Sequence, residues 1–129
     1  MNRNSKGFTL IELVTVIAIL GVLAAMTVPK FFSLQTKARI EVANQIIGTI
    51  RAGLETYAAN QIVFSGSKTY PEVSTTTDLL TSILNPVPDG WSYTNGTITN
   101  VRGDSTFSYS YSTSGANYTL GGRTFESSP

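Results

Sequence analysis

The stretch Lys6-Gly7-Phe8-Thr9-Leu10-Ile11-Glu12-Leu13 places a single carboxylate just inside a long apolar run. From Leu13 to Pro29, 17 consecutive residues carry no charge. An ionisable side chain at the edge of such a segment is costly, so we interpret it as functional and expect a compensating partner for it. Glu12 is therefore the first candidate site residue.

The apolar segment is long enough to cross a membrane. Phe8 to Val28 is 21 residues, which as a helix is about 32 Å long and matches the roughly 30 Å hydrocarbon core of a bilayer. Proline removes a backbone hydrogen bond from a helix, and glycine adds backbone freedom. We therefore expect helix flexibility between Gly21 and Pro29, although both residues are also tolerated in ordinary membrane helices.

The sequence Lys6-Gly7-Phe8-Thr9-Leu10-Ile11-Glu12, followed by this apolar helix, resembles the processing and assembly motif of type IV pilins and type II secretion pseudopilins. The resemblance implies that prepilin peptidase cuts after Gly7 and N-methylates Phe8. It also implies that Glu12 pairs with the positive Phe8 amine of a neighbouring subunit. Such a pair is physically reasonable, because either charge alone would lose several kcal/mol of hydration in an apolar core.

Three other interpretations of the N-terminus remain open. The first is a secretory signal peptide, with Arg3 and Lys6 as its basic region, Leu13 to Leu23 as its apolar region and a small-residue cleavage site ending at Ala24. Glu12 inside the apolar run argues against it. The second is a membrane anchor that forms no polymer. The third is a buried core helix, which a chain of 129 residues rarely supports over such a length.

Composition limits the remaining functions. The chain has 9 Lys and Arg, 8 Asp and Glu, and neither His nor Cys. We therefore expect no nucleic acid as the main partner, no disulfide, no His- or Cys-based zinc site and no cofactor. The acidic residues are scattered, so no catalytic residue is proposed and the chain is not expected to be an enzyme. After Asp89 only Asp104 and Glu126 are acidic, which is too few oxygen ligands to predict a calcium site.

The orientation in the membrane follows from the resemblance rather than from charge. Arg3 and Lys6 precede the apolar segment, but Lys30, Lys37 and Arg39 follow it closely, so the positive-inside rule does not decide. The resemblance implies that the leader is cytoplasmic and that the part after Pro29 lies outside the inner membrane.

Beyond Pro29 the helical pattern becomes amphipathic and continues to about Asn60. One face is predicted to pack on a domain and comprises Phe32, Val42, Ala43, Ile46, Ile47, Ile50, Leu54, Tyr57 and Ala58. Lys37, Glu41 and Arg51 are among the residues on the opposite face.

The C-terminal part of the sequence predicts a small sheet. A short helical pattern from Asp78 to Leu84, capped by Thr76 or Thr77, is followed by alternation of period two. Asn95-Gly96 between alternating residues is a strong hairpin signal. We expect four short antiparallel strands, whose aromatic face would pack on the helix and includes Trp91, Tyr93, Phe107, Tyr109 and Tyr111.

These observations predict an α+β, pilin-like fold: a long N-terminal helix packed on a small antiparallel β-sheet. The expected parts are a leader (1–7), a transmembrane and polymerisation segment (8–29) and a globular domain outside the cytoplasm (30–129). The resemblance implies a structural filament subunit of a type IV pilus or type II secretion pseudopilus. Its implied partners are copies of itself, prepilin peptidase, an inner-membrane assembly platform and, before assembly, membrane lipid.

An alternative from a different class is a binding protein. The chain would then be a minor or tip pilin, or a membrane-anchored protein, whose aromatic and hydroxyl-rich domain recognises a surface or a secreted cargo. The sequence does not choose between a pilus and a pseudopilus, although the missing cysteines favour a pseudopilin or a small, disulfide-free pilin.

Overall fold

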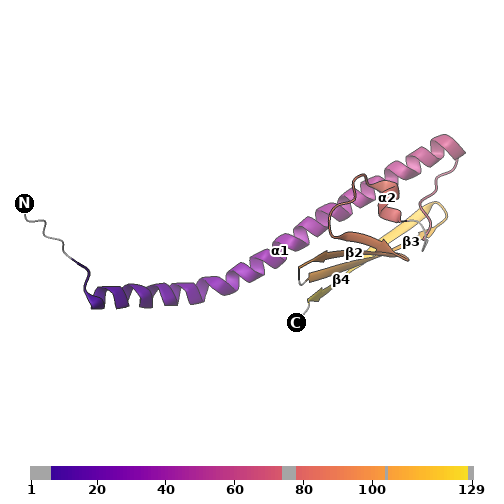
Figure 1. Cartoon of the computed structure of the whole chain (residues 1–129). Helices are drawn as coiled ribbons and strands as arrows, with labels where there is room; N and C mark the ends of the chain where they lie inside the picture. The colour runs from indigo at the N-terminus through magenta and orange to yellow at the C-terminus, as the bar shows by residue number, and fades with distance from the viewer. Residues whose placement is uncertain (1–6, 74–77, 104, 128–129) are drawn as a thin grey trace, which may run out of the picture. The chain divides into compact units, whose positions relative to one another are not determined.

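The computed structural model describes residues 7–73, 78–103 and 105–127 (Figure 1). Its elements are α1 (Leu10–Ser65), α2 (Leu79–Ile83), β1 (Trp91–Thr94), β2 (Thr97–Arg102), β3 (Ser105–Ser114) and β4 (Asn117–Ser127). By internal contacts the chain divides into residues 1–41 and residues 42–129. The predicted α+β fold, a long apolar helix followed by a four-stranded antiparallel sheet, is confirmed.

Helix α1 has 56 residues and extends five residues beyond the expected end at Asn60. Its end is set by Gly66, which has a φ of 73°, a left-handed conformation that ends helices and that glycine adopts without strain. The Gly66 N–H donates to the Ile62 carbonyl at 3.0 Å. Pro29 lies inside α1, as expected for the apolar segment.

The second unit, residues 42–129, is built around the later half of α1. Ala43, Ile47, Ile50, Leu54 and Ala58 are buried, as the amphipathic pattern predicts. Side chains at this spacing share one helix face, and fully burying a residue such as Ile50 contributes about 1.5–3 kcal/mol. This face is one side of the core.

Two residues of the predicted apolar face are exposed, and Ile46 and Tyr57 are half-buried. The side chain of Phe32 is 67% exposed and that of Val42 is 50% exposed. Phe32 has the same direction around the helix axis as Ile50, but it belongs to the first unit. Val42 lies at the margin of the apolar face, about 80° around the axis from Ile50.

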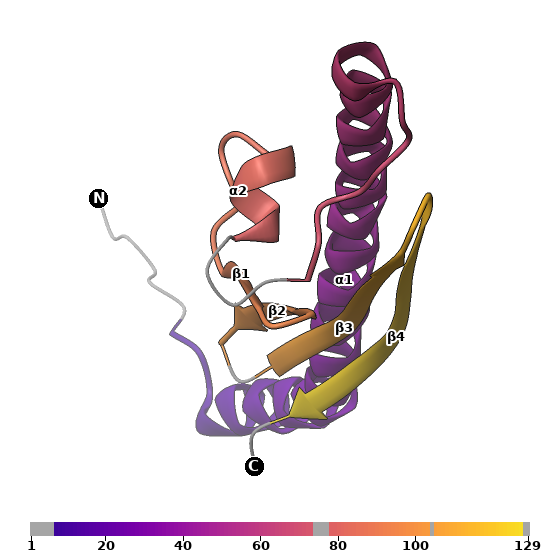
Figure 2. The ribbon, with the colours of Figure 1, turned by 90° about the vertical axis from the view of Figure 1, so that its right-hand side faces the viewer.

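The sheet has the strand order β1-β2-β3-β4, with every neighbouring pair antiparallel (Figure 2). The predicted hairpin turn joins β1 to β2, and its two central residues, Asn95 and Gly96, have φ values of 44° and 81°. Positive φ at both positions is typical of a type I′ turn, which matches the twist of the flanking strands.

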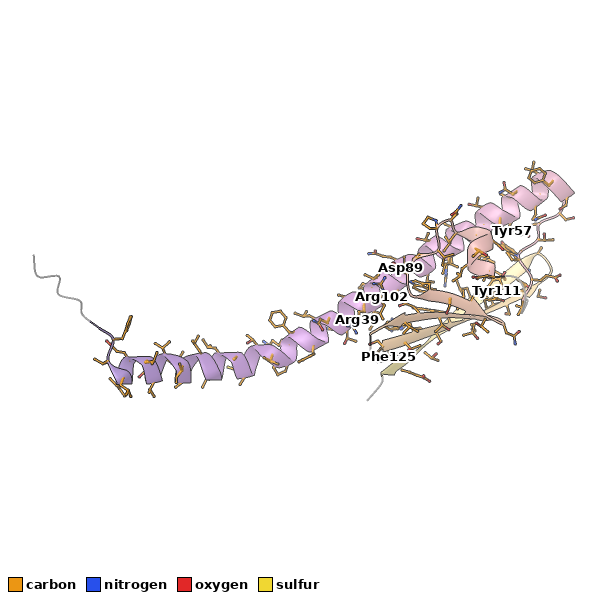
Figure 3. The ribbon with its side chains drawn as sticks, viewed as in Figure 1. Arg39, Tyr57, Asp89, Arg102, Tyr111 and Phe125 are labelled. Atoms are coloured by element: carbon orange, nitrogen blue, oxygen red, sulfur yellow. The ribbon has the colours of Figure 1, made fainter. Side chains whose placement is uncertain are left out.

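The inner face of the sheet is aromatic, as predicted. Trp91, Phe107, Tyr109 and Tyr111 are buried, and Tyr93 is half-buried. Tyr57 of α1 lies over the end of the sheet that holds Tyr111 (Figure 3). Alternation therefore places the large rings of the strands against the helix and leaves the opposite face to solvent.

Strand β2 differs from the expected pattern at one position. Val101 is apolar but 52% exposed, whereas the polar Asn100 is 97% buried. The Asn100 side-chain amide donates to the Gly90 carbonyl at 3.3 Å, so this buried polar group has a partner. The hydrogen bond allows a polar residue to take the inward position of the strand.

Strand β4 continues well past Leu120 and includes the Gly121-Gly122 pair. The register shifts opposite Ser108 to Ser110, and Gly122 has a φ of 61°. A glycine with positive φ at an extra strand residue is typical of a β-bulge. This pair therefore has a structural role.

The segment between α1 and β1 is bonded to both α1 and β3, and the helix within it, α2, has its own N-cap. The Tyr70 hydroxyl donates to Glu55 Oε1 at 2.9 Å, and the Tyr111 hydroxyl donates to the Pro71 carbonyl at 2.7 Å. The observed cap of α2 is Asp78, whose carboxylate accepts from the Leu80 N–H at 2.9 Å. The caps expected at Thr76 or Thr77 lie outside the described residues.

Candidate functional site

The start of α1 is closed by a reciprocal pair of hydrogen bonds. The Thr9 N–H donates to Glu12 Oε2 at 2.9 Å, and the Glu12 N–H donates to Thr9 Oγ1 at 3.3 Å. Thr9 precedes the first helical residue, Leu10, so the arrangement is a capping box that satisfies two of the free N–H groups at a helix start. The Glu12 carboxylate thus has a partner within its own chain.

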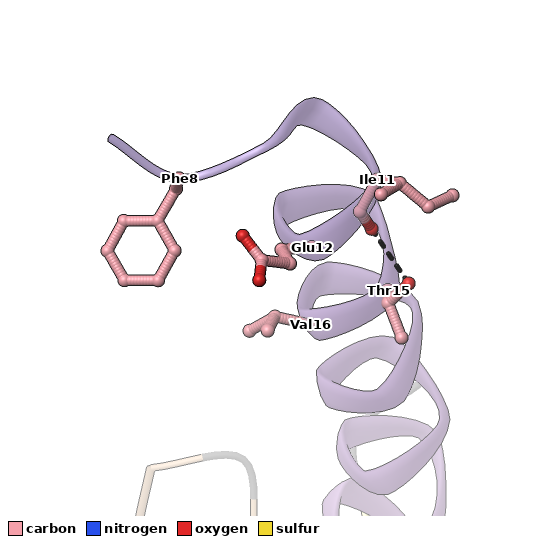
Figure 4. Close-up of a pocket in the computed structure, with 5 residues that line it drawn as sticks. All are labelled: Phe8, Ile11, Glu12, Thr15 and Val16. Carbon is pink, nitrogen blue, oxygen red and sulfur yellow. Dashed lines mark hydrogen bonds between the residues drawn. The ribbon is translucent and has the colours of Figure 1, made fainter. Parts of the chain in front are cut away.

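This cap leaves the carboxylate able to bind a second group. A carboxylate offers about four acceptor positions, and only Oε2 is used by Thr9. Glu12 and Phe8 line an open hollow of about 360 Å³ together with Ile11, Thr15 and Val16 (Figure 4). The site therefore combines a negative charge with an exposed apolar wall.

The residues predicted for processing lie directly before the helix. Gly7 and Phe8 are outside α1 and exposed, and the Phe8 side chain is 93% exposed. A peptidase needs an accessible backbone at the bond it cuts, and non-helical exposed chain provides one. The structure thus brings Phe8 and Glu12 together at one end of the helix, whereas Gly21 and Pro29 lie farther along it.

The hydroxyl groups of the apolar segment are satisfied within the helix. The Thr15 hydroxyl donates to the Ile11 carbonyl at 2.7 Å, and the Thr27 hydroxyl donates to the Leu23 carbonyl at 2.9 Å. Such bonds remove the cost of placing a hydroxyl in hydrocarbon. By length and composition this helix could cross a membrane.

Thr9 was missed as a site residue. Its signal was present in the sequence, because Thr9-Leu10-Ile11-Glu12 before an apolar run fits the spacing of a capping box. Among the described residues, no three acidic, His or Cys side chains gather in a way that could hold a metal ion.

Comparison with known proteins agrees with this geometry. Residues 2–28 match the family model described as the prokaryotic N-terminal methylation motif. The chain is 35% identical over 91 residues to type II secretion system core protein G of Pseudomonas aeruginosa, which covers 69% of this chain and 60% of that protein.

The chain belongs to the type IV pilin and pseudopilin family. It is also 34% identical over 79 residues to a fimbrial protein of Neisseria meningitidis, covering 61% of this chain and 46% of that one. The type IV major pilin protein PilA of Myxococcus xanthus is 34% identical over 71 residues, covering 55% of this chain and 30% of PilA. This pilin-family chain therefore spans between about a third and three fifths of these relatives. No solved structure shows significant similarity to it.

Proposed function

We propose that the chain is the structural, non-enzymatic subunit of a type IV pilus or a type II secretion pseudopilus. Prepilin peptidase cuts it after Gly7 and N-methylates Phe8. Before assembly the segment 8–29 lies in the inner membrane, and the residues after it lie outside the cytoplasm. The assembly platform then extracts the chain into a filament of identical subunits.

The observation that supports this most is the start of α1. A single carboxylate, Glu12, lies beside Phe8 at the beginning of a helix whose apolar side chains are exposed. Exposed side chains include Leu10, Ile11, Val14, Ile17, Leu20 and Leu23, each at 45% or more. So many exposed apolar groups need a lipid or protein environment. A polymer of parallel helices provides it, with the Glu12 carboxylate compensating the neighbour's amine.

Within this class, one observation favours a pseudopilin. The chain has no cysteine, which fits a pseudopilin as well as a small, disulfide-free pilin. However, its match to the secretion protein G covers more of both proteins than its match to the meningococcal fimbrial protein or to PilA. Flexibility of α1 between Gly21 and Pro29 would help the helix leave the bilayer. Loss of protein secretion on deletion would indicate a pseudopilus, and loss of surface fibres a pilus.

The binding-protein alternative has one supporting observation, the hydroxyl-rich outer face of the sheet. Ser92, Thr99, Ser108 and Thr124 lie opposite one another in a row across the four strands. However, the aromatic rings that commonly stack on ligands are turned inward. We therefore rank this function second.

Immuno-electron microscopy tests the proposal. Sheared surface fractions from cells that make the chain with its assembly machinery are labelled with antibody against residues 42–129. A filament subunit gives label along the whole length of the fibres. Label confined to fibre ends indicates a tip subunit, and label that stays with membranes while fibres are absent contradicts the proposal.

A further inference from the structure

Two lysines form an unusual feature directly after the apolar segment. Lys30 follows 17 uncharged residues, and Lys37 comes seven residues later. In the orientation of the proposed function, on which this inference rests, both lie on the outer side of the membrane. Positive charge is normally concentrated on the cytoplasmic side. The position of these two lysines on the outer side therefore calls for a physical explanation.

The two side chains share one face of α1. Seven residues make almost two full turns, so the lysines differ by about 20° around the helix axis and by about 10 Å along it. Both side chains are exposed. Because helical side chains lean toward the N-terminus, the Lys37 ammonium is directed back toward Lys30 and the apolar segment.

Neither lysine has a carboxylate partner within the described chain. By contrast, the Lys68 ammonium of the second unit pairs with Glu55 Oε2 at 3.4 Å. Glu41 lies four residues after Lys37 but makes no ion pair with it. The face thus holds two ammonium groups without a compensating anion.

Between the lysines, the hydroxyl groups are already used. Ser33 Oγ donates to the Lys30 carbonyl at 2.9 Å, and Thr36 Oγ1 donates to the Phe32 carbonyl at 3.2 Å. Phe31 and Phe32 are 66% and 67% exposed. Phe32 lies on the opposite side of the helix from the two lysines, so their ammonium groups project from their own exposed face. A lysine at the end of an apolar segment can lay its aliphatic stem along apolar surface and place its ammonium group in the headgroup layer.

The depth of the lysines fits this boundary. With Phe8 at the cytoplasmic edge of the hydrocarbon, Lys30 lies about 33 Å farther along the helix, at the outer edge of a core roughly 30 Å thick. Lys37 then lies in the headgroup layer, where its ammonium turns back toward the lipid phosphates.

We propose that Lys30 and Lys37 form a binding face for anionic phospholipid headgroups of the outer leaflet, which holds the unassembled subunit in the membrane. The negative phosphate groups supply the charge that the chain lacks. Assembly must break these contacts, so the lipid competes with polymer formation.

The test uses full-length protein in phosphatidylcholine vesicles that contain increasing fractions of phosphatidylglycerol. Electron paramagnetic resonance of spin-labelled lipids measures the preference of the protein for phosphatidylglycerol over phosphatidylcholine. We expect this preference to fall about five-fold for each lysine replaced by glutamine, since one basic residue near an anionic surface contributes about that factor. The double variant Lys30→Gln/Lys37→Gln should also lose most of its salt dependence.

Two controls accompany the double variant. Lys30→Arg/Lys37→Arg keeps the charges and should keep the preference. Lys68→Gln removes one charge from the second unit and should leave the preference unchanged. Arg3 and Lys6 are present in every variant, so their effect on the cytoplasmic leaflet cancels.

Several results would overturn the inference. An unchanged preference in the double glutamine variant, or an equal loss in Lys68→Gln, shows that this face does not bind lipid. If the double glutamine variant keeps its preference for phosphatidylglycerol but no longer forms filaments in cells, the lysines instead pair with carboxylates of another copy. Failure of the unaltered protein to insert into vesicles of any composition contradicts the membrane location itself, whereas insertion without preference contradicts only this inference.

Discussion

Thr9 and Glu12 bond to each other twice across the first turn of α1, through Thr9 N–H to Glu12 Oε2 at 2.9 Å and Glu12 N–H to Thr9 Oγ1 at 3.3 Å. Glu12 thus has a role in a single subunit, where it caps the helix, besides the role proposed for it in the filament. The two roles require different properties of the side chain. Capping needs an acceptor oxygen, whereas pairing with an amine needs negative charge.

Glu12→Gln separates these roles. Glutamine keeps an acceptor for the Thr9 N–H but removes the charge, whereas Glu12→Ala removes both. We expect both variants to insert and to be processed, and neither to form filaments. An ammonium left unpaired in an apolar core typically costs about 3–5 kcal/mol at every subunit contact. Electron microscopy of sheared fractions and immunoblotting of membranes measure the two outcomes.

Thr9→Ala is the matched control for this pair. It removes the capping hydroxyl, at a cost of about 1 kcal/mol, and keeps the Glu12 carboxylate. We expect it to assemble. Normal filaments from Glu12→Gln together with none from Glu12→Ala would show that capping, and not charge pairing, is what assembly needs.

The main elements of the fold could be predicted from the sequence, because helical periodicity and turn-forming residues are local features of the chain. The apolar helix, the buried positions from Ala43 to Ala58 and the Asn95-Gly96 hairpin were predicted for that reason. Phe32 was misplaced because helical periodicity gives direction around the axis but not how far along it a domain extends. Asn100 was missed because its burial depends on a hydrogen bond to Gly90, ten residues away in the chain.

The sequence predicted only some of the residues of the candidate site. The motif resemblance predicted Gly7, Phe8 and Glu12. The structure adds Thr9, whose position three residues before Glu12 fits a capping box. The bulge at Gly122 had no clear signal, because two adjacent glycines fit a loop as well as a distorted strand.

Processing at Gly7 is the second prediction. The protein isolated from its host should begin at an N-methylated Phe8, because the bond between these residues lies in exposed, non-helical chain. Intact-mass spectrometry measures this directly. Gly7→Leu should leave the leader attached and the protein in the membrane. A mature chain that begins near Ala25 would establish the signal-peptide alternative.

Independent folding of the part of the chain after Pro29, which contains the second unit (42–129), is the third prediction. Residues 30–129 should form a soluble monomer, because the later half of α1 and the sheet bury each other without lipid. Thermal unfolding followed by circular dichroism should be cooperative. Ile50→Ala, at a fully buried position, should lower the free energy of unfolding by about 2–5 kcal/mol. An aggregated fragment would mean that the apolar face needs another partner.

Alkaline pH should destabilise this fragment, which is the fourth prediction. Burial raises the pKa of Tyr111, whose hydroxyl donates to the Pro71 carbonyl, and burial also raises the pKa of Tyr109 and Tyr118. The unfolded chain releases these protons near pH 10, whereas the folded protein retains them. The contribution of these tyrosines to the free energy of unfolding is therefore fully present below about pH 10 and is lost as the pH rises above it. Urea titrations at several pH values measure the slope, which Tyr111→Phe should reduce; an unchanged slope would exclude Tyr111 as a cause.

Two glycines of α1 provide the fifth prediction, because their surroundings differ sharply. A Cβ added to Gly53 would lie 2.9 Å from the Ile83 carbonyl oxygen and 3.2 Å from the Ile83 Cβ, whereas a Cβ added to Gly48 would have nothing within 4 Å. The close approach of α1 to the end of α2 thus depends on the missing side chain at Gly53.

Gly53→Ala should therefore destabilise the 30–129 fragment by about 1–3 kcal/mol, because the Ile83 backbone must move to relieve the overlap. Gly48→Ala should instead stabilise it by about 0.5–1 kcal/mol, since alanine restricts the unfolded chain and favours helix. Urea-induced unfolding of both variants compares them directly. Equal stabilisation by the two substitutions would show that α2 can withdraw from α1 at no cost, and that their close contact is not required for the fold.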